Sequence, residues 1–223
     1  MEGPRLRRTE TCVIYFISYP KCGRTWCRTI INQYAKKVKA TPPKKHVWTH
    51  ITFGNVKDPE DRGSGWLKED ATRILLKRND SDALVSLYHD QIKRVTSVRI
   101  NYKNKTIDDY VLNKSDNLLA FKKKSRELKY DYEFSYEKMS SDPFNTFLPV
   151  MEIVFGDVNL DKYREVIDFC NFDNLSKLER EGKIDMRGSK VFHKTRKGKV
   201  GSHKKELKKE TIRKLNKKFK RRK

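Results

Sequence analysis

The most constraining feature of this sequence is a short apolar stretch that is followed at once by a tight loop and a helical pattern. Residues Cys12–Ser18 (CVIYFIS) are rich in β-branched and aromatic side chains, a composition typical of a buried strand. Tyr19–Pro20 ends the stretch, and an amphipathic helix is expected to begin near Gly23–Thr25 and to end before Pro42–Pro43. Its apolar residues at i+4 spacing are Trp26, Ile30, Tyr34 and Val38. The segment therefore predicts a strand, a tight loop and a helix.

The rest of the chain alternates between strand and helix patterns. Further strands are predicted at Val47–Thr49, Arg73–Lys77 and Tyr130–Tyr136. Helices are predicted after the capping residues Asn79 and Asp80, and over Ile107–Lys124, Pro143–Phe155, Leu160–Phe169 and Lys204–Phe219, with a Gly-, Lys- and Arg-rich loop at Arg187–Gly201. This alternation predicts an α/β fold, a three-layer sandwich with a short parallel sheet flanked by helices. At 223 residues, the chain is expected to form a single domain over 1–223, with a frayed basic tail at about 217–223.

The charge of the chain is strongly positive and unevenly distributed. Lys and Arg number 52 against 29 Asp and Glu, and the 36% hydrophobic content excludes collagen-like, mucin-like and wholly disordered chains. Residues 190–223 hold 17 basic and two acidic residues, and residues 11–50 hold eight basic residues and no acid. An anionic partner is therefore expected near both segments. Charge alone leaves open a small phosphorylated ligand, a nucleic acid, a polyanionic glycan, or merely a solvated basic face.

Neither a membrane span nor a metal site is indicated by the sequence. The apolar stretch Cys12–Ile17 lies behind a charged leader and is far shorter than a membrane span or a secretory signal core, so a cytoplasmic location is expected. The four cysteines form no CxxC pair and have no His partner at zinc-finger spacing, so no metal and no disulfide framework is expected. They are Cys12, Cys22, Cys27 and Cys170.

The loop between the first strand and its helix is the first place where chemistry is expected. A loop that leaves a parallel strand and opens a helix offers free N–H groups and the positive end of the helix dipole, which together bind phosphate or sulfate. Lys21 adds a charge, Gly23 permits close approach, and Trp26 offers a flat face for a purine. The candidate binding residues here are Lys21, Cys22, Gly23, Arg24, Thr25 and Trp26. The spacing is not that of a Walker A motif, and core packing of Trp26 is the structural alternative.

Two strings together resemble one enzyme family. Tyr19–Trp26 closely resembles the YPKSGTTW loop that binds the 5′-phosphosulfate in sulfotransferases that use 3′-phosphoadenosine 5′-phosphosulfate (PAPS). Ile74–His89 resembles the strand-to-helix segment RNPxDxxVSxYH of the same family. The resemblance assigns Arg78 and Ser86 to the 3′-phosphate, which agrees with a bidentate guanidinium fork and a helix hydroxyl. Taken singly, Ser86 is typical of a solvated or back-bonded helix serine.

Later segments resemble the same family in the right order. Phe192–Gly201 is similar to the RKGxxGDWK loop that closes over the 3′-phosphate, with Arg196, Lys197 and Gly198 matching and Ser202–Lys204 in place of Asp-Trp-Lys. Phe134–Pro143 resembles the YEDMxxDP stretch. The resemblance implies that Tyr136 lies near the adenine and that Phe172 packs against the base, with core packing as the alternative for both. The similarity runs from about Cys12 to Phe219.

Sulfuryl transfer needs a base on the acceptor and a cation at the bridging oxygen of the leaving phosphate. Lys21 is the candidate cation. The candidate catalytic residues are Lys21, His50 and Ser86. Thr49–His50 resembles the THxP base segment of the family, with Thr52 in place of its Pro, and a neutral His suits proton removal at pH 7. The alternatives for the base are His46, Asp58, Glu60 and Asp61. His89 and His203 are expected on a helix surface or in a loop.

The resemblance implies a PAPS-dependent sulfotransferase that releases adenosine 3′,5′-bisphosphate (PAP) and sulfates a hydroxyl or amine of a small-molecule or glycan acceptor. Because the chain is shorter than a typical cytosolic member, mainly between Lys21 and His50, an open acceptor site is expected. The C-terminal dimer motif KxxxTVxxxE is not evident near Glu210–Ile212, which favours a monomer. The alternatives are a non-catalytic RNA- or polyanion-binding protein, a nucleotide phosphotransferase, and an enzyme whose basic tail recruits an acidic polymer.

Overall fold

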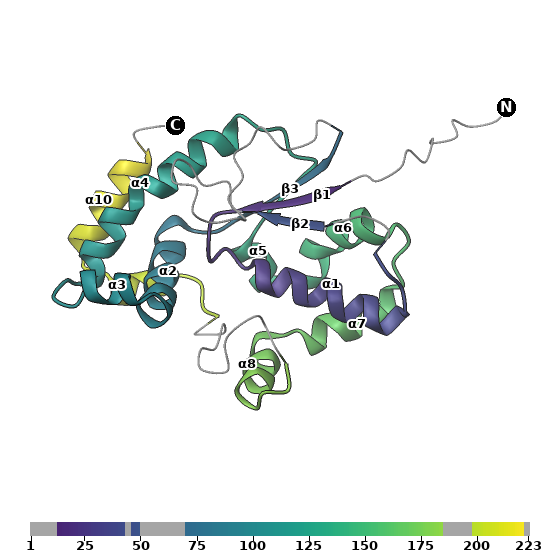
Figure 1. Cartoon of the computed structure of the whole chain (residues 1–223). Coiled ribbons are helices and arrows are strands. Elements are labelled where there is room, and N and C mark those ends of the chain that lie inside the picture. The colour runs from purple at the N-terminus through teal and green to yellow at the C-terminus, as the bar shows by residue number, and fades with distance from the viewer. Residues whose placement is uncertain (1–12, 43–45, 50–69, 185–197, 221–223) are drawn as a thin grey trace.

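The apolar segments of the sequence form a parallel four-stranded sheet, in the order β2-β1-β3-β4, in a computed structural model of the chain (Figure 1). The structure describes residues 13–42, 46–49, 70–184 and 198–220. The strands are β1 (Ile14–Ser18), β2 (His46–Thr49), β3 (Thr72–Lys77) and β4 (Tyr132–Ser135). All three strand pairs are parallel, so the carboxyl ends of the strands lie at one edge of the sheet. The α/β prediction is confirmed.

Helices cover both faces of the sheet, as strands that are apolar on both sides require. The long helices are α1 (Arg24–Val38), α2 (Asp80–Arg94), α4 (Ile107–Arg126), α6 (Pro143–Phe155), α7 (Leu160–Phe169) and α10 (Lys209–Lys220). The shorter ones are α3 (Thr96–Asn101), α5 (Tyr136–Ser141), α8 (Phe172–Arg180) and α9 (His203–Glu206). Figure 1 shows α1 and α7 on one side of the sheet and α4 with α10 on the other.

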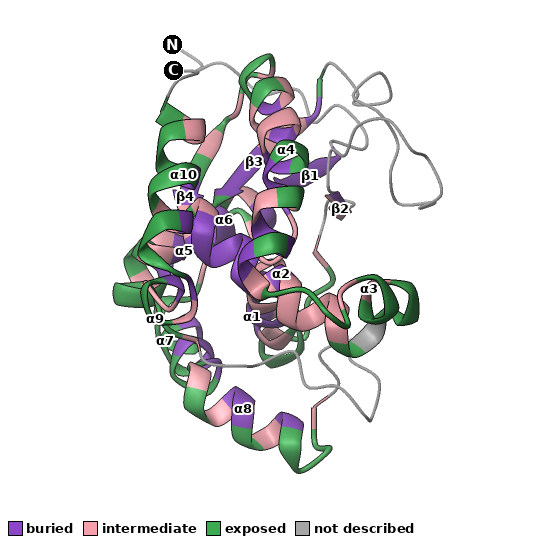
Figure 2. Ribbon diagram, turned by 90° about the vertical axis from the view of Figure 1, so that its left-hand side faces the viewer, coloured by how far each residue is buried: buried purple, intermediate pink, exposed green. Residues whose placement is uncertain are grey.

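The core lies around the central strand. Every residue of β1 is buried, and Ile14, Ile17 and Ile74 have no exposed surface. Figure 2 shows β1 and β3 as buried strands in the interior, while α3 and α10 carry exposed residues. The continuous apolar run Cys12–Ser18 thus predicted a strand correctly because a central parallel strand is covered on both faces.

Several predicted bounds differ from the structure by one or two residues, and two of the differences have a clear physical cause. The fourth strand ends at Ser135 rather than Tyr136, because the Ser135 side chain accepts a hydrogen bond from the Lys138 N–H and starts α5. The predicted helix Lys204–Phe219 is interrupted at Leu207, whose backbone is extended. The next residue, Lys208, donates its N–H to the Asp108 carboxylate at 3.0 Å, so a contact with α4 replaces the helical bond.

Candidate active site

The loop between β1 and α1 turns the chain at the carboxyl edge of the sheet. Lys21 has a φ of 68° and Gly23, the N-cap residue of α1, has a φ of 105°. A Cβ at Gly23 would lie 2.9 Å from Cδ2 of Tyr136, so the packing against this ring requires glycine. Among the described residues, no side chain caps α1, and its first turn carries the half-buried Arg24 and Thr25. The loop therefore presents N–H groups and positive charge to an anion.

Lys21 is held between two other elements. Its Nζ lies 3.0 Å from Oδ1 of Asp90 on α2, and the two side chains are 19% and 10% exposed. Its backbone carbonyl accepts a hydrogen bond from Nη1 of Arg78 at 2.7 Å. The Asp90 carboxylate thus fixes the amine of Lys21, although Asp90 lies outside the predicted motifs.

Arg78 joins the second predicted segment to the loop and to the start of α5. It follows β3 at the carboxyl edge of the sheet, and its guanidinium carbon lies 4.3 Å from the centre of the Tyr136 ring. A cation over an aromatic face at this distance is stabilised by the ring quadrupole. Three residues separated along the chain, Lys21, Arg78 and Tyr136, therefore meet at one edge of the sheet.

Aromatic side chains extend this cluster away from the sheet. Trp26 donates its Nε1–H to the carbonyl of Cys170 at 2.8 Å, and its ring centre lies 6.0 Å from that of Tyr136. Phe172, at the start of α8, is half-buried and packs against Gly198 of the late loop. The N–H···O bond orients the indole ring of Trp26, so the described part of the cluster offers flat apolar faces beside the cations.

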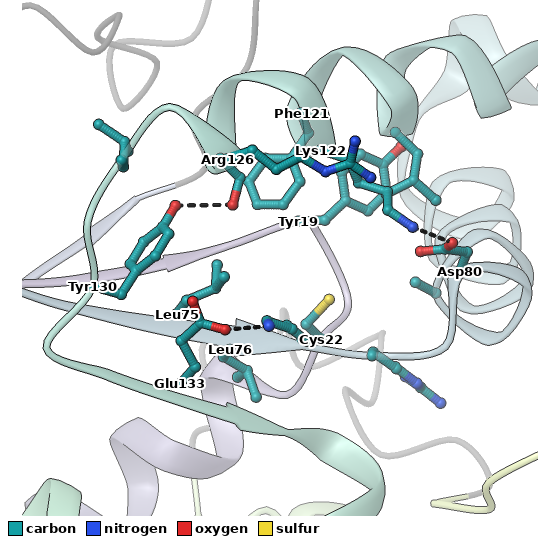
Figure 3. A pocket seen from close by; sticks show the side chains of 16 residues that line it. Tyr19, Cys22, Leu75, Leu76, Asp80, Phe121, Lys122, Arg126, Tyr130 and Glu133 are labelled. Carbon is teal, nitrogen blue, oxygen red and sulfur yellow. Dashed lines mark hydrogen bonds and ion pairs between the residues drawn. The ribbon is translucent and has the colours of Figure 1, made fainter. Parts of the chain in front are cut away.

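Ser86 lies on the same helix as the partner of Lys21. It is half-buried on α2, four residues before Asp90. Residues at i and i+4 share one helix face, so the face that contacts Lys21 also carries the Ser86 hydroxyl. Cys22, by contrast, is buried, and Figure 3 shows its thiol turned toward a cavity on the other side of the loop.

A family model for the sulfotransferase domain matches residues 64–223, which is more than half of the chain. The chain belongs to the sulfotransferase family. The match includes the segments of Arg78, Tyr136 and Phe172 and begins after the Lys21 loop. The resemblance of that loop to the family motif is therefore an observation independent of the family match.

Solved sulfotransferase structures share the fold at low identity. Retinol dehydratase, solved with androsterone and the inactive cofactor PAP, is 15% identical with a TM-score of 0.67, covering 93% of this chain and 79% of that one. Mouse sulfotransferase SULT7A1, solved with PAP, is 15% identical with a TM-score of 0.65, covering 94% and 83%. Retinol dehydratase with retinol and PAP is 14% identical with a TM-score of 0.62, covering 93% and 80%. A comparison with curated proteins found no match.

The predicted base and part of the late loop fall outside the described residues of this sulfotransferase. These are His50, the alternatives Asp58, Glu60 and Asp61, and the late-loop residues Arg196 and Lys197. The alternative His46 is described, and it pairs in register with Ile14 at the opposite end of the strands from Lys21. His46 lies three residues before Thr49 along β2, or about 10 Å away. Burial lowers the pKa of His46, and its ring lies edge-on to Phe16, so a packing role fits it better.

The described part of the late loop is anchored to α2 through Asp82. This carboxylate is fully buried and accepts hydrogen bonds from the N–H groups of Gly201 at 2.6 Å and His203 at 3.0 Å. The Nδ1 atom of His203 lies 2.8 Å from Oδ1 of Asp82. Burial alone raises the pKa of Asp82, but the bonds from His203 and Gly201 together outweigh it, and the pKa is lowered.

This anchor corrects the expectation for His203. Its side chain is only 9% exposed, so the prediction of a helix-surface or loop residue was wrong about its burial. The prediction failed because the partner, Asp82, is 121 residues away in the sequence. His89, 30% exposed on α2, gives a second link to this segment, with its Nε2 atom 2.5 Å from Oε2 of Glu206.

The described thiols are free and buried. Burial raises the pKa of Cys22 and of Cys170 to about 12, so both remain protonated at neutral pH. No group of three or more His, Cys, Asp or Glu side chains in the described ranges is arranged to hold a metal ion. In the same ranges, no helix is both long and apolar enough to cross a membrane.

We expect Gly198→Ala to destabilise the protein more than Gly182→Ala does. Both glycines have a positive φ, 60° and 68°, so both variants carry similar backbone strain. A Cβ at Gly198 would lie 2.4 Å from Cδ2 of Phe172, whereas no atom lies within 4 Å at Gly182. Overpacking of this kind costs about 1–3 kcal/mol, which urea unfolding can measure. Equal losses in the two variants would mean that Phe172 does not pack on the late loop.

Proposed function

We propose that this sulfotransferase moves the sulfuryl group of PAPS to a hydroxyl or amine of a small-molecule or glycan acceptor and releases PAP. The observation that carries the proposal is the convergence of Lys21, Arg78 and Tyr136. Arg78 donates to the Lys21 carbonyl at 2.7 Å and lies over the Tyr136 ring at 4.3 Å. Three motifs that are separate in the sequence thus form one cluster of cations and aromatic rings.

The residues of the cluster fit the parts of PAPS. The N-terminus of α1, which no described side chain caps, and the Lys21 amine suit the anionic phosphosulfate. The Arg78 guanidinium and the Ser86 hydroxyl suit the 3′-phosphate, since a planar fork binds phosphate oxygens bidentately. Trp26, Tyr136 and Phe172 suit the adenine. Solved neighbours that hold PAP support the same nucleotide here.

The side chains divide the work of the transfer. PAPS supplies the sulfuryl group when it is bound. The Lys21 ammonium stabilises negative charge that develops on the bridging oxygen, and the Asp90 carboxylate holds this ammonium in place at 3.0 Å. His50 is assigned to remove the acceptor proton, because a neutral imidazole is a suitable base at pH 7. Arg78 fixes the carbonyl of Lys21 and thereby the direction of the loop.

Calorimetric titration at moderate salt tests the proposal. PAP, ATP and a short single-stranded RNA are compared, and we expect tight, saturable binding of PAP and much weaker binding of ATP. Binding of RNA with no preference for a 3′-phosphate would instead identify a non-catalytic polyanion-binding protein. An acceptor panel of phenols, alcohols, amines and sulfatable glycans, assayed with radiolabelled PAPS, then tests the transfer itself.

Arg78→Met should lower the affinity for PAP by about ten- to a hundredfold, the usual value of a hydrogen-bonded charge pair. Adenosine 5′-monophosphate lacks the 3′-phosphate, so its affinity should stay within about threefold. The matched control is Arg99→Met, because Arg99 lies exposed on α3. Equal losses for both nucleotides would reject the 3′-phosphate assignment and indicate that Arg78 acts only by supporting the loop.

A further inference from the structure

A cavity of about 480 Å³ lies between β3 and α4, on the side of the Lys21 loop that Cys22 faces (Figure 3). Leu75 and Leu76 of β3 line it from the sheet, and Leu118 and Phe121 line it from α4. Lys21, Trp26 and Asp90 are not among its lining residues. Cys22 and Arg78 do line it, so the cavity adjoins the proposed donor site, whereas its apolar walls from β3 and α4 have no role in the proposed reaction.

The polar part of the lining is positively charged. Four basic side chains and two acidic ones line the cavity. Lys122 pairs with Asp80 at 2.6 Å, and Lys77 pairs with Glu133, so both acids are matched. Figure 3 shows Lys122 and Arg126, one turn apart on α4, along the same side of the cavity. The net charge of the lining therefore favours an anion.

We propose that this cavity binds a small amphipathic anion, with a flat apolar body between β3 and α4 and its anionic group beside Lys122 and Arg126. A volume of about 480 Å³ suits a small molecule and is too little for a folded partner. Burial of the apolar body against Leu75, Leu118 and Phe121 drives binding, and charge-assisted hydrogen bonds orient it. Lys122 and Arg126 are not assigned to the donor nucleotide, so the proposal can be tested apart from that assignment.

The site binds without forming a covalent bond. The Cys22 thiol faces the cavity, but its side chain is buried and burial raises its pKa to about 12. A protonated thiol is a poor nucleophile. The Ser125 hydroxyl is engaged with the Tyr130 hydroxyl at 2.8 Å, so it is a structural contact of the cavity wall.

Fluorescence titration with two matched probes tests the charge requirement. Anilinonaphthalene sulfonate is a flat apolar anion, and N-phenylnaphthylamine has the same rings without the sulfonate. We expect saturable one-to-one binding of the sulfonate and binding of the neutral probe weaker by about tenfold or more. Equal affinities would overturn the assignment of an anionic ligand. Complete displacement of the sulfonate by PAP would place the probe in the donor site and overturn the proposal.

A pair of substitutions tests the location. Leu118→Trp fills the cavity from α4 and should weaken binding of the sulfonate by about tenfold or more while PAP still binds. Leu160→Trp is the matched control, because Leu160 is 51% exposed on α7, and it should change neither. Unchanged sulfonate binding in a folded Leu118→Trp protein would overturn the proposal.

Hydrogen exchange of the unsubstituted protein decides the location even if Leu118→Trp fails to fold. With the sulfonate bound, we expect protection of the amides in 75–83 and 118–133. Protection confined to other segments would overturn the proposal. Because the exchange is measured without PAP, its result can be interpreted even if the assignment of the donor nucleotide is wrong.

Discussion

Replacing Lys21 with Ala should lower the turnover number by at least about a hundredfold, while the affinity for PAP changes by less than about tenfold. The reason is that one preorganised donor at a developing charge contributes about two to three orders of magnitude to the rate. The ammonium is only 19% exposed and is held by Asp90, so it is oriented before any ligand binds. The measurement is an initial rate with radiolabelled PAPS and an acceptor from the panel, together with calorimetry of PAP.

Two further variants make the result specific. Lys36→Ala removes an exposed lysine of α1, the helix that follows the Lys21 loop, and should leave the turnover number unchanged. Lys21→Arg keeps the charge and should retain more activity than Lys21→Ala. If Lys21→Ala reduced PAP affinity as much as turnover, Lys21 would be a binding residue, and an unaltered turnover number would remove it from the reaction.

The regular elements were predictable because their signals are local. The apolar run of β1 and the i+4 pattern of α1 depend only on residues within one segment, and both were found. Helices α7 and α6 were predicted with the bounds that the structure gives. Helix α8 was missed although Asn171, whose side chain accepts from the N–H of Asn174, is a capping residue, because nine residues give only a short amphipathic pattern.

The site was predictable only where its residues lie in motifs. Resemblance to the family identified Lys21, Arg78 and Tyr136, and the fold brings them together, while their roles in the reaction stay predictions. Asp90 was missed although it contacts Lys21, because a lone carboxylate on a helix has many ordinary explanations. Its partner is 69 residues away, so no local pattern could connect the two.

Asp82 was missed for the same reason, and the largest expected loss of stability follows from it. Asp82→Ala should lower the free energy of unfolding by about 2–5 kcal/mol, because two backbone N–H donors lose their acceptor at about 1–3 kcal/mol each. The substitution leaves the N–H groups of Gly201 and His203 without the acceptor that they have in the structure. Urea unfolding monitored by circular dichroism measures the change.

The control and the pH dependence separate this anchor from a general loss of charge. Asp116→Ala removes the partner of Lys218, but Asp116 is 73% exposed, so its effect should be small. Because the pKa of Asp82 is lowered in the folded protein, its contribution is fully present above the ordinary aspartate pKa of about 4 and is lost as the pH falls through the lowered value. The difference between the unsubstituted protein and Asp82→Ala should shrink over that range. If Asp82→Ala lowered the free energy of unfolding no more than Asp116→Ala at neutral pH, the buried contact between α2 and the late loop would not stabilise the fold. The loop would then need another anchor to keep Gly198 against Phe172.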